Sequence, residues 1–309
     1  MQGYLRQSRR RSIKKMWPYY LMTLPGIAYF LVFHYAPMFG LIIGFKDYSI
    51  YTGIFESDWV GLAVFDRLFR LAGFKRALRN TVIISFYKLC TGFPASILIA
   101  LLLNELRTRA YSKFVQTSLI IPHFVSWVVI YGLLYALLSP NIGIMSVVYK
   151  ALAPESAVPN LLADKGVFRS LLVITNVWRN AGFASIMYTA AIAGIDPQLY
   201  ESAQLDGAGR FRQAIHVTLP CIRTTIITMW ILRLGSILSV DFEQVLALQN
   251  PVVLETGDII DTFVYRMGLK EAEYSLSTAA GLFKSAIAVI FVVGTNAIVK
   301  RIDADSALM

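Results

Sequence analysis

Residues 196–220, DPQLYESAQLDGAGRFRQAIHVTLP, are a polar insertion between two long apolar runs, and this arrangement decides the predicted fold. Asp196 can serve as the N-cap of a helix whose first residue is Pro197, where a missing N–H costs nothing. Tyr200, Ala203 and Leu205 could give this helix an apolar side. The insertion therefore begins with a short helix of its own.

A glycine-rich turn ends this first helix. Asp206-Gly207-Ala208-Gly209 holds two glycines close together, which permit a positive φ or a close approach of another backbone. Residues 210–216 predict a second short helix, with Phe211 and Ile215 one turn apart on one face. The stretch thus predicts a helix–turn–helix outside the bilayer that presents Glu201 and the glycine turn to a partner.

The remainder of the chain is typical of a membrane protein. Of its 309 residues, 56% are hydrophobic and 16% are charged, whereas soluble domains carry about 25% charged residues. Apolar runs long enough to span a bilayer predict spans at about 19–45, 81–103, 117–138, 168–195, 222–248 and 276–299. The predicted fold class is an all-α membrane protein with six transmembrane helices, in one domain over 16–303 between tails at 1–15 and 304–309.

Basic residues predict the orientation of these spans. Six Lys and Arg side chains lie within residues 1–15, and the positive-inside rule places such a tail in the cytoplasm. Six spans then place both termini and residues 196–220 in the cytoplasm. The apolar run after the tail is longer than the core of a signal peptide, so we expect no cleaved signal. The net charge of +10 suits loops facing anionic lipid.

Polar residues inside the predicted spans are candidates for a solute pathway, because lipid-exposed charges are costly. The indole of Trp178 could stack on a sugar ring, and neighbouring amides could bind hydroxyls. Interhelical bonding is an equal alternative for Trp178 and Asn180, and a structural pair is favoured for Arg179. We expect Lys88 and Lys284 to make interfacial or interhelical contacts. The pathway candidates are Asn176, Trp178, Arg179, Asn180, Arg233 and Asp241.

Two segments outside the spans carry weaker signals. Apolar residues recur at helical spacing over 62–69, which predicts an amphipathic surface helix. A structural collar is favoured there over a docking site. Residues 249–274 are expected to form an extended external loop.

Several classes of function lack their residues. There is no GxxxxGK[ST] phosphate loop, and the three histidines show no metal-ligand spacing. No nucleophile–base set or paired carboxylates converge in sequence, which argues against an enzyme. A secondary transporter stays open as an alternative, although the chain shows no clear inverted repeat and its mid-span charges are mostly basic.

The helix–turn–helix resembles the EAA loop of ABC importer permeases. In that family an EAA triplet is followed by a Gly and by a spacing that ends in Leu-Pro; this chain has Ser202 where the pattern has Ala. The resemblance implies that an ATPase cleft receives Glu201 and Gly207. The implied coupling residues are Glu201, Ser202, Ala203, Asp206, Gly207, Ala208, Phe211, Leu219 and Pro220.

The resemblance covers nearly the whole chain. It is carried by segments such as Tyr35-Ala-Pro37-Met38, Trp59-Val-Gly61-Leu62, Ile120-Ile-Pro122, Phe242-Glu-Gln244, Tyr265-Arg-Met-Gly268 and Thr278-Ala-Ala-Gly281. These are similar to carbohydrate-type permeases, in particular the polysaccharide and complex-oligosaccharide subgroup related to the maltose and alginate permeases.

This similarity implies a type I importer subunit in a bacterial cytoplasmic membrane. The expected partners are a second homologous permease, two ABC ATPase subunits and an external glycan-binding protein or lipoprotein. ATP and Mg would bind to the ATPase, with no cofactor in this chain and no enzymatic activity of its own. A non-sugar cargo within the same transporter class is the other alternative.

Overall fold

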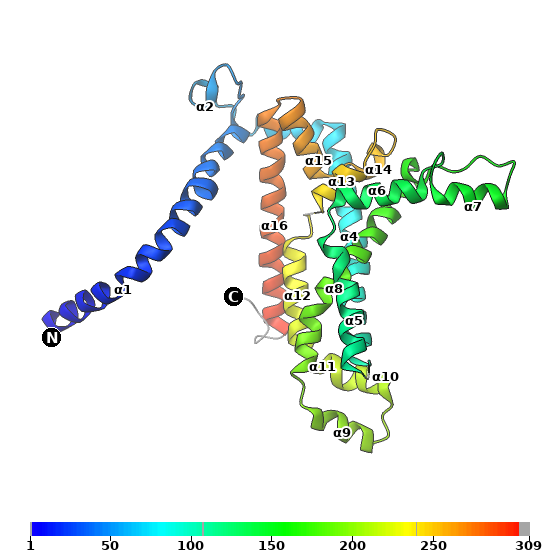
Figure 1. Ribbon diagram of the computed structural model, residues 1–309. Helices are drawn as coiled ribbons and strands as arrows, with labels where there is room; N and C mark the ends of the chain where they lie inside the picture. Colours follow the sequence, from blue (N-terminus) through cyan, green and yellow to red (C-terminus); the bar gives the residue numbers. More distant parts are fainter. Residues whose placement is uncertain (1, 107, 239, 303–309) are drawn as a thin grey trace.

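The computed structural model describes residues 2–106, 108–238 and 240–302, and these contain no β-strand beyond an isolated bridge between Lys46 and Trp59. The predicted all-α class is therefore confirmed. Five long helices dominate Figure 1: α1 (Gln2–Phe30), α4 (Ala72–Asn104), α8 (Phe168–Ala193), α12 (Arg223–Gly235) and α16 (Tyr274–Ile302). The predicted tail 304–309 lies outside the described residues.

Three continuous helical stretches among the described residues are long and apolar enough to cross a membrane. They cover 16–45, 72–104 and 274–297, and two bent helix pairs raise the possible number to five. With 26 residues, α8 would extend about 39 Å at 1.5 Å per residue, but its polar side chains leave it less apolar than these three. It packs along α4 in the centre of the bundle.

The expected third span, 117–138, is not one continuous helix, because a sharp bend divides it. Helix α5 (Arg109–Ile120) continues through a 3-10 turn at Ile121–Phe124, and α6 (Trp127–Leu138) then leaves at 99°. Pro122 removes a backbone donor at the bend, and the Ser126 hydroxyl caps α6 by accepting the N–H of Val129 at 3.4 Å. Helix α5, of which only residues 117–120 were expected to belong to a span, packs along α8, whereas α6 and α7 (Ile144–Leu152) run crosswise (Figure 1).

The expected fifth span, 222–248, is interrupted rather than continuous. Helix α12 ends at Gly235, the described part of 236–241 is not α-helical, and α13 (Phe242–Leu248) begins after Asp241. A polar carboxylate just before the first turn of α13 suits a helix start, not the interior of a span. The break places Val240 and Asp241 beside the centre of the bundle.

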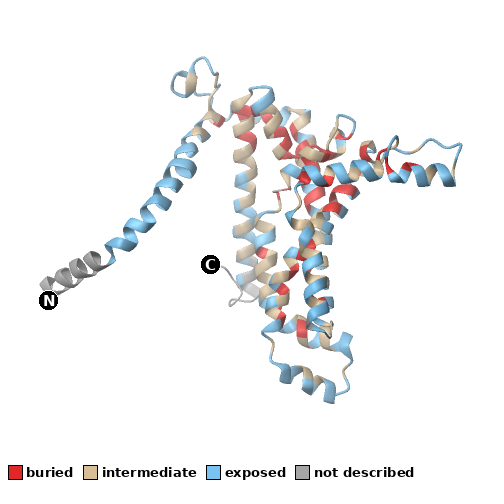
Figure 2. Cartoon of the chain, in the orientation of Figure 1, coloured by how far each residue is buried: buried red, intermediate tan, exposed pale blue. Residues whose placement is uncertain are grey.

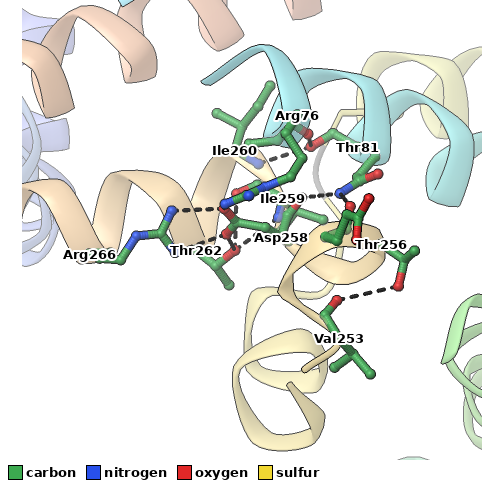
Figure 3. A network of polar contacts seen from close by, with 12 residues as sticks. Arg76, Thr81, Val253, Thr256, Asp258, Ile259, Ile260, Thr262 and Arg266 are labelled. Carbon is green, nitrogen blue, oxygen red and sulfur yellow. Dashed lines mark hydrogen bonds and ion pairs between the residues drawn. The ribbon is translucent and has the colours of Figure 1, made fainter. Parts of the chain in front are cut away.

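Residues 249–274, expected to be an extended loop, fold into short helices. These are α14 (Leu254–Gly257), α15 (Ile260–Tyr265) and a π-helical turn at Arg266–Lys270. Asp258, between α14 and α15, is fully buried, and its carboxylate accepts hydrogen bonds from Arg266 at 2.7 Å and from Thr262 at 2.9 Å (Figure 3). The hydrogen bond to Asp258 raises the pKa of the Arg266 guanidinium.

The same region is tied to α4. Arg76 reaches the Asp258 carboxylate at 3.4 Å, Asn80 donates to the carbonyl of Asp258 at 3.1 Å, and Thr81 accepts the N–H of Ile260 at 2.9 Å. We call Arg76, Asp258, Thr262 and Arg266 the Asp258 cluster (Figure 3). Removing either the carboxylate or a guanidinium from such a cluster leaves an uncompensated charge inside the protein, which is strongly destabilising.

Helix α3 (Ala63–Arg70) is the predicted amphipathic helix, and its packing fits the structural role favoured from sequence over a docking site. Val64 and Leu68 on its apolar side are buried against residues of α4, α15 and α16. Its charged face points outward, where Arg70 pairs with Asp66 at 2.9 Å. The preceding short helix α2 (Gly53–Glu56) lies in the loop near the start of the bundle.

The first helical stretch stands apart from the bundle. Every side chain from 16 to 39 is exposed, and Figures 1 and 2 show α1 running away from the other helices as a single arm. The 3-10 segment Ala36–Phe45, which follows this stretch, packs against α16 and α3. An apolar surface of this extent requires lipid or another protein to cover it.

Gly182 allows α5 and α8 to approach closely, and its replacement is a test of this packing. A Cβ at this position would overlap the backbone of Leu119, which cannot move as a side chain can. We expect Gly182→Ala to destabilise the protein by about 1–3 kcal/mol, the usual cost of overpacking. Thermal unfolding in detergent measures this, with Gly281→Ala in α16 as the control, since its Cβ would meet nothing within 4 Å. Equal stability of the two variants would contradict the close approach.

Candidate functional site

Residues 196–220 form the predicted helix–turn–helix at the end of the molecule opposite α14 and α15 (Figure 1). The first helix, α9 (Pro197–Leu205), is capped by Asp196, whose carboxylate accepts the N–H of Gln198 at 3.0 Å. The second comprises α10 (Arg210–Gln213), a π-helical turn (Ala214–Thr218) and α11 (Leu219–Cys221). Gly207 has φ +76°, so the turn uses the freedom that only glycine has without strain.

The nine predicted coupling residues fall into two groups. Glu201, Ser202, Asp206, Gly207, Phe211 and Pro220 are exposed, whereas Ala203, Ala208 and Leu219 are half-buried. The N–H of Ala208 bonds to the carbonyl of Ala203 at 2.9 Å, which closes the turn. The first group forms the outer surface of the hairpin, and the second holds its shape.

Two apolar side chains extend this outer surface. Leu205 is 90% exposed and Phe211 is 78% exposed. Leu205, expected on the apolar side with Tyr200 and Ala203, instead points away from the hairpin. Large apolar side chains beside an exposed glycine turn are typical of a protein-docking surface.

The hairpin contacts α4 and α8 and continues into α12. Arg210 forms an ion pair with Glu105 at the end of α4, at 3.0 Å. Leu219 packs on a cluster that contains Ala100 of α4 and Tyr188 of α8. Its second half leads directly into α12 at Arg223. A displacement of the hairpin therefore acts on α4 and α12.

A cavity of about 290 Å³ lies between α4, α8, α12 and the break at 236–241. Five of the six predicted pathway residues line it: Asn176, Arg179, Asn180, Arg233 and Asp241. Trp178 does not line it; its side chain is 50% exposed on another side of α8. The structure thus brings the candidates of α8 together with Arg233 and Asp241 of the expected fifth span. Trp178, on which a sugar ring was expected to stack, is not among them.

Lys88, which was expected to make interfacial or interhelical contacts, lines the cavity. It donates to the side-chain oxygen of Gln244 and lies 4.0 Å from Asp241. Asp241 also accepts a hydrogen bond from Asn176 at 2.6 Å. Lys88 therefore does bridge helices, as expected, and it also faces the cavity. Phe242-Glu-Gln244 was part of the family resemblance, and it could have indicated this contact.

Arg179 has the structural role favoured from sequence. Its Nε donates to the carbonyl of Val125 at 3.0 Å, and its guanidinium lies 4.8 Å from the ring centroid of Trp127. His123, for which the sequence suggested no role, stacks on Phe183 with centroids 4.1 Å apart and bonds to Asn180 at 3.1 Å. Together these groups fix the wall of the cavity beside the α5–α6 bend.

A second, wider hollow of about 680 Å³ adjoins the cavity and shares Val240 and Asp241 with it. Aromatic side chains line it, with the rings of Phe242 and Tyr265 5.6 Å apart and Tyr274 nearby. Sugar rings present C–H faces that pack on aromatic rings, while hydroxyls seek polar groups. The aromatic platform expected at Trp178 is available here instead.

Comparison with family models and characterised proteins gives a consistent result. The model of the "binding-protein-dependent transport system inner membrane component" family matches residues 92–304. Protein LplB of Bacillus subtilis is 43% identical over 92% of this chain and 89% of its own length. The polygalacturonan/rhamnogalacturonan transport system permease protein YteP of the same organism is 45% identical over 91% of this chain and 87% of its own.

Solved structures agree with these relatives. A chain of a bacterial ABC transporter involved in the import of the acidic polysaccharide alginate superposes with a TM-score of 0.87 and 40% identity, covering 96% of this chain and 99% of its own. A chain of a bacterial alginate ABC transporter in complex with an alginate pentasaccharide-bound periplasmic protein has a TM-score of 0.86 and 41% identity, covering 94% and 97%.

Proposed function

The chain belongs to the family of binding-protein-dependent transport system inner membrane components, and from this we propose how it works as the permease of an ABC importer for oligo- or polysaccharides. It is a multi-pass membrane protein and a transport subunit rather than an enzyme. The type I importer fold and the carbohydrate class expected from sequence are both confirmed. The family and the relatives support an ABC importer permease over the alternative of a secondary transporter.

One observation carries the proposed mechanism: the exposed hairpin continues directly into α12, and α12 lines the cavity. The hairpin docks in a cleft of an ABC ATPase, with Glu201 meeting a basic residue there and Gly207 in close contact. Closure of the ATPase dimer around ATP and Mg moves the hairpin as a rigid lever. The movement tilts α12 about the break at 236–241 and switches the access of the cavity.

The assembly includes further subunits that this chain does not supply. A second permease faces the cavity and covers the exposed arm of α1, which makes little contact with its own bundle. An external binding protein delivers the glycan to the outer end, where the aromatic hollow lies. Both termini and the hairpin face the cytoplasm.

Affinity purification of the tagged chain from native membranes in mild detergent tests this proposal. We expect an ABC ATPase, a second permease and a glycan-binding protein to co-purify. Glu201→Lys places the wrong charge against the basic residue and should lower ATPase recovery about tenfold, the effect of roughly 1.4 kcal/mol of binding energy. Gln204→Lys, exposed on the same helix, is the control for added charge.

Two results would contradict the proposal. One is the recovery of a homo-oligomer without any ATPase. The other is glycan uptake that continues after ATP depletion and stops when the ion gradient is removed.

A further inference from the structure

We propose that Arg233 is the carboxylate-binding residue of a subsite for acidic sugars in the cavity between α4, α8 and α12. This inference rests on the proposed function and narrows its cargo to glycans that contain uronic acids. The argument depends on which charges at the cavity are already neutralised within the chain and which are available to a ligand.

Three cations and one carboxylate line the cavity: Lys88, Arg179, Arg233 and Asp241. Arg179 is committed to the wall, since it bonds to the Val125 carbonyl and stacks on Trp127. Lys88 is committed to Gln244 and Asp241 on the far side of the break. Among the described residues, the lining of the cavity thus holds a single carboxylate for three cations.

That carboxylate is also occupied. Asn176 donates to Asp241 at 2.6 Å and Lys88 lies 4.0 Å away. Gln244, the other partner of Lys88, is held in turn by the Leu172 carbonyl and the Thr175 hydroxyl, each at 2.8 Å. This network holds Asp241 against α8 and α4, and among the described residues Asp241 forms no ion pair with Arg233 of α12.

The guanidinium of Arg233 remains without such a partner. Within the described ranges it forms no hydrogen bond and no ion pair, yet the side chain lines the cavity. It is close enough to Lys88 for the two positive charges to repel each other. An unpaired Arg in the interior of a membrane is costly, so an anion beside it is strongly favoured.

A carboxylate on a sugar suits these surroundings best. The planar guanidinium donates two parallel hydrogen bonds to a carboxylate, which a lysine or an amide cannot do. Asn180 and Ser236 line the same cavity and can bind the hydroxyls of the ring. The volume of about 290 Å³ suits a short stretch of glycan held by a few polar contacts.

The test uses the complete importer reconstituted in proteoliposomes with its binding protein at saturation. Uptake is compared for an oligouronate and for its fully methyl-esterified form, which keeps the sugar but removes the charge. We expect Arg233→Gln to lower uptake of the acid about tenfold more than uptake of the ester, and Arg233→Lys to restore part of the difference. Arg67→Gln, at an exposed pair that does not line the cavity, is the control and should change neither.

A second measurement removes the selectivity of the binding protein. The detergent-solubilised complex without binding protein is titrated with the oligouronate, and Arg233→Gln should weaken binding about tenfold relative to the Arg67→Gln complex. Unchanged affinity and an unchanged acid-to-ester ratio would overturn the proposal. So would loss of the second permease from the Arg233→Gln complex, because the counter-ion would then be a residue of that subunit. A wild-type importer that moves a neutral oligosaccharide but neither of these two glycans would also overturn the proposal and leave the proposed function standing, whereas an assembled importer that moves no glycan at all would refute the proposed function.

Discussion

Gly207→Asp is expected to reduce glycan uptake about 100-fold or more while the protein is still inserted at normal levels. The chain itself tolerates the change, because a Cβ at Gly207 would meet nothing within 4 Å and Asp is among the residues that accept a positive φ. The docked ATPase would not tolerate it. An unpaired charge buried at an interface costs about 3–5 kcal/mol, more than the roughly 2.7 kcal/mol that corresponds to a hundredfold change.

The measurements are ATP hydrolysis and uptake by the same reconstituted complex. We expect hydrolysis to be uncoupled from uptake or lost with the ATPase. Gly53→Asp is the matched control, since Gly53 also has a positive φ, at +72°, and open space around its Cβ, but lies in the loop before α3. Comparable membrane levels of both variants would exclude backbone strain as the cause. Normal uptake by Gly207→Asp would refute the docking role of the turn.

Asp258→Asn is expected to destabilise the protein by about 3 kcal/mol, the low end of the cost of breaking a buried ion pair, because it removes the buried counter-ion of the half-buried guanidinium groups of Arg76 and Arg266. Asp258 is fully buried and accepts hydrogen bonds from Arg266 on both carboxylate oxygens, at 3.1 and 2.7 Å. The neutral amide is similar in size but carries no charge and can accept through one atom only. The outer ends of α4 and α15 should then separate at a lower temperature.

Thermal unfolding of the purified complex, followed by size-exclusion chromatography, measures the loss. Glu273→Gln removes a carboxylate from an exposed pair with Arg67 at 3.3 Å and should cost no more than about 1 kcal/mol. If the two variants unfold at the same temperature, the Asp258 cluster is not the element that holds this end together.

Much of the fold could be predicted because local signals agreed with one another. The N-cap at Asp196, the glycine turn and the Leu-Pro ending predicted the hairpin, since capping and turn conformation depend on residues close in sequence. The apolar runs predicted the all-α class, because a bilayer requires helices whose backbone bonds are internal. Residues 62–69 were predicted as a helix from their spacing alone.

The elements that sequence placed less well depend on contacts between distant segments. A bend of 99° follows Pro122 because α6 packs on α13 rather than along α5. Residues 254–270 fold because Asp258 meets Arg76, 182 positions earlier in the chain. A hydropathy pattern contains no record of such partners, so the segment looked like an extended loop.

The sequence by itself determined the class of the protein, the position of its hairpin and which charged residues fall within the long apolar runs. The tertiary structure alone decided what those charges do. It paired Lys88 with Gln244 and Asp241, committed Arg179 to the wall, and left Arg233 facing the cavity. The reason is physical: a charge in a medium of low dielectric constant is governed by the groups within a few ångströms of it, and here those groups come from helices far apart in the chain.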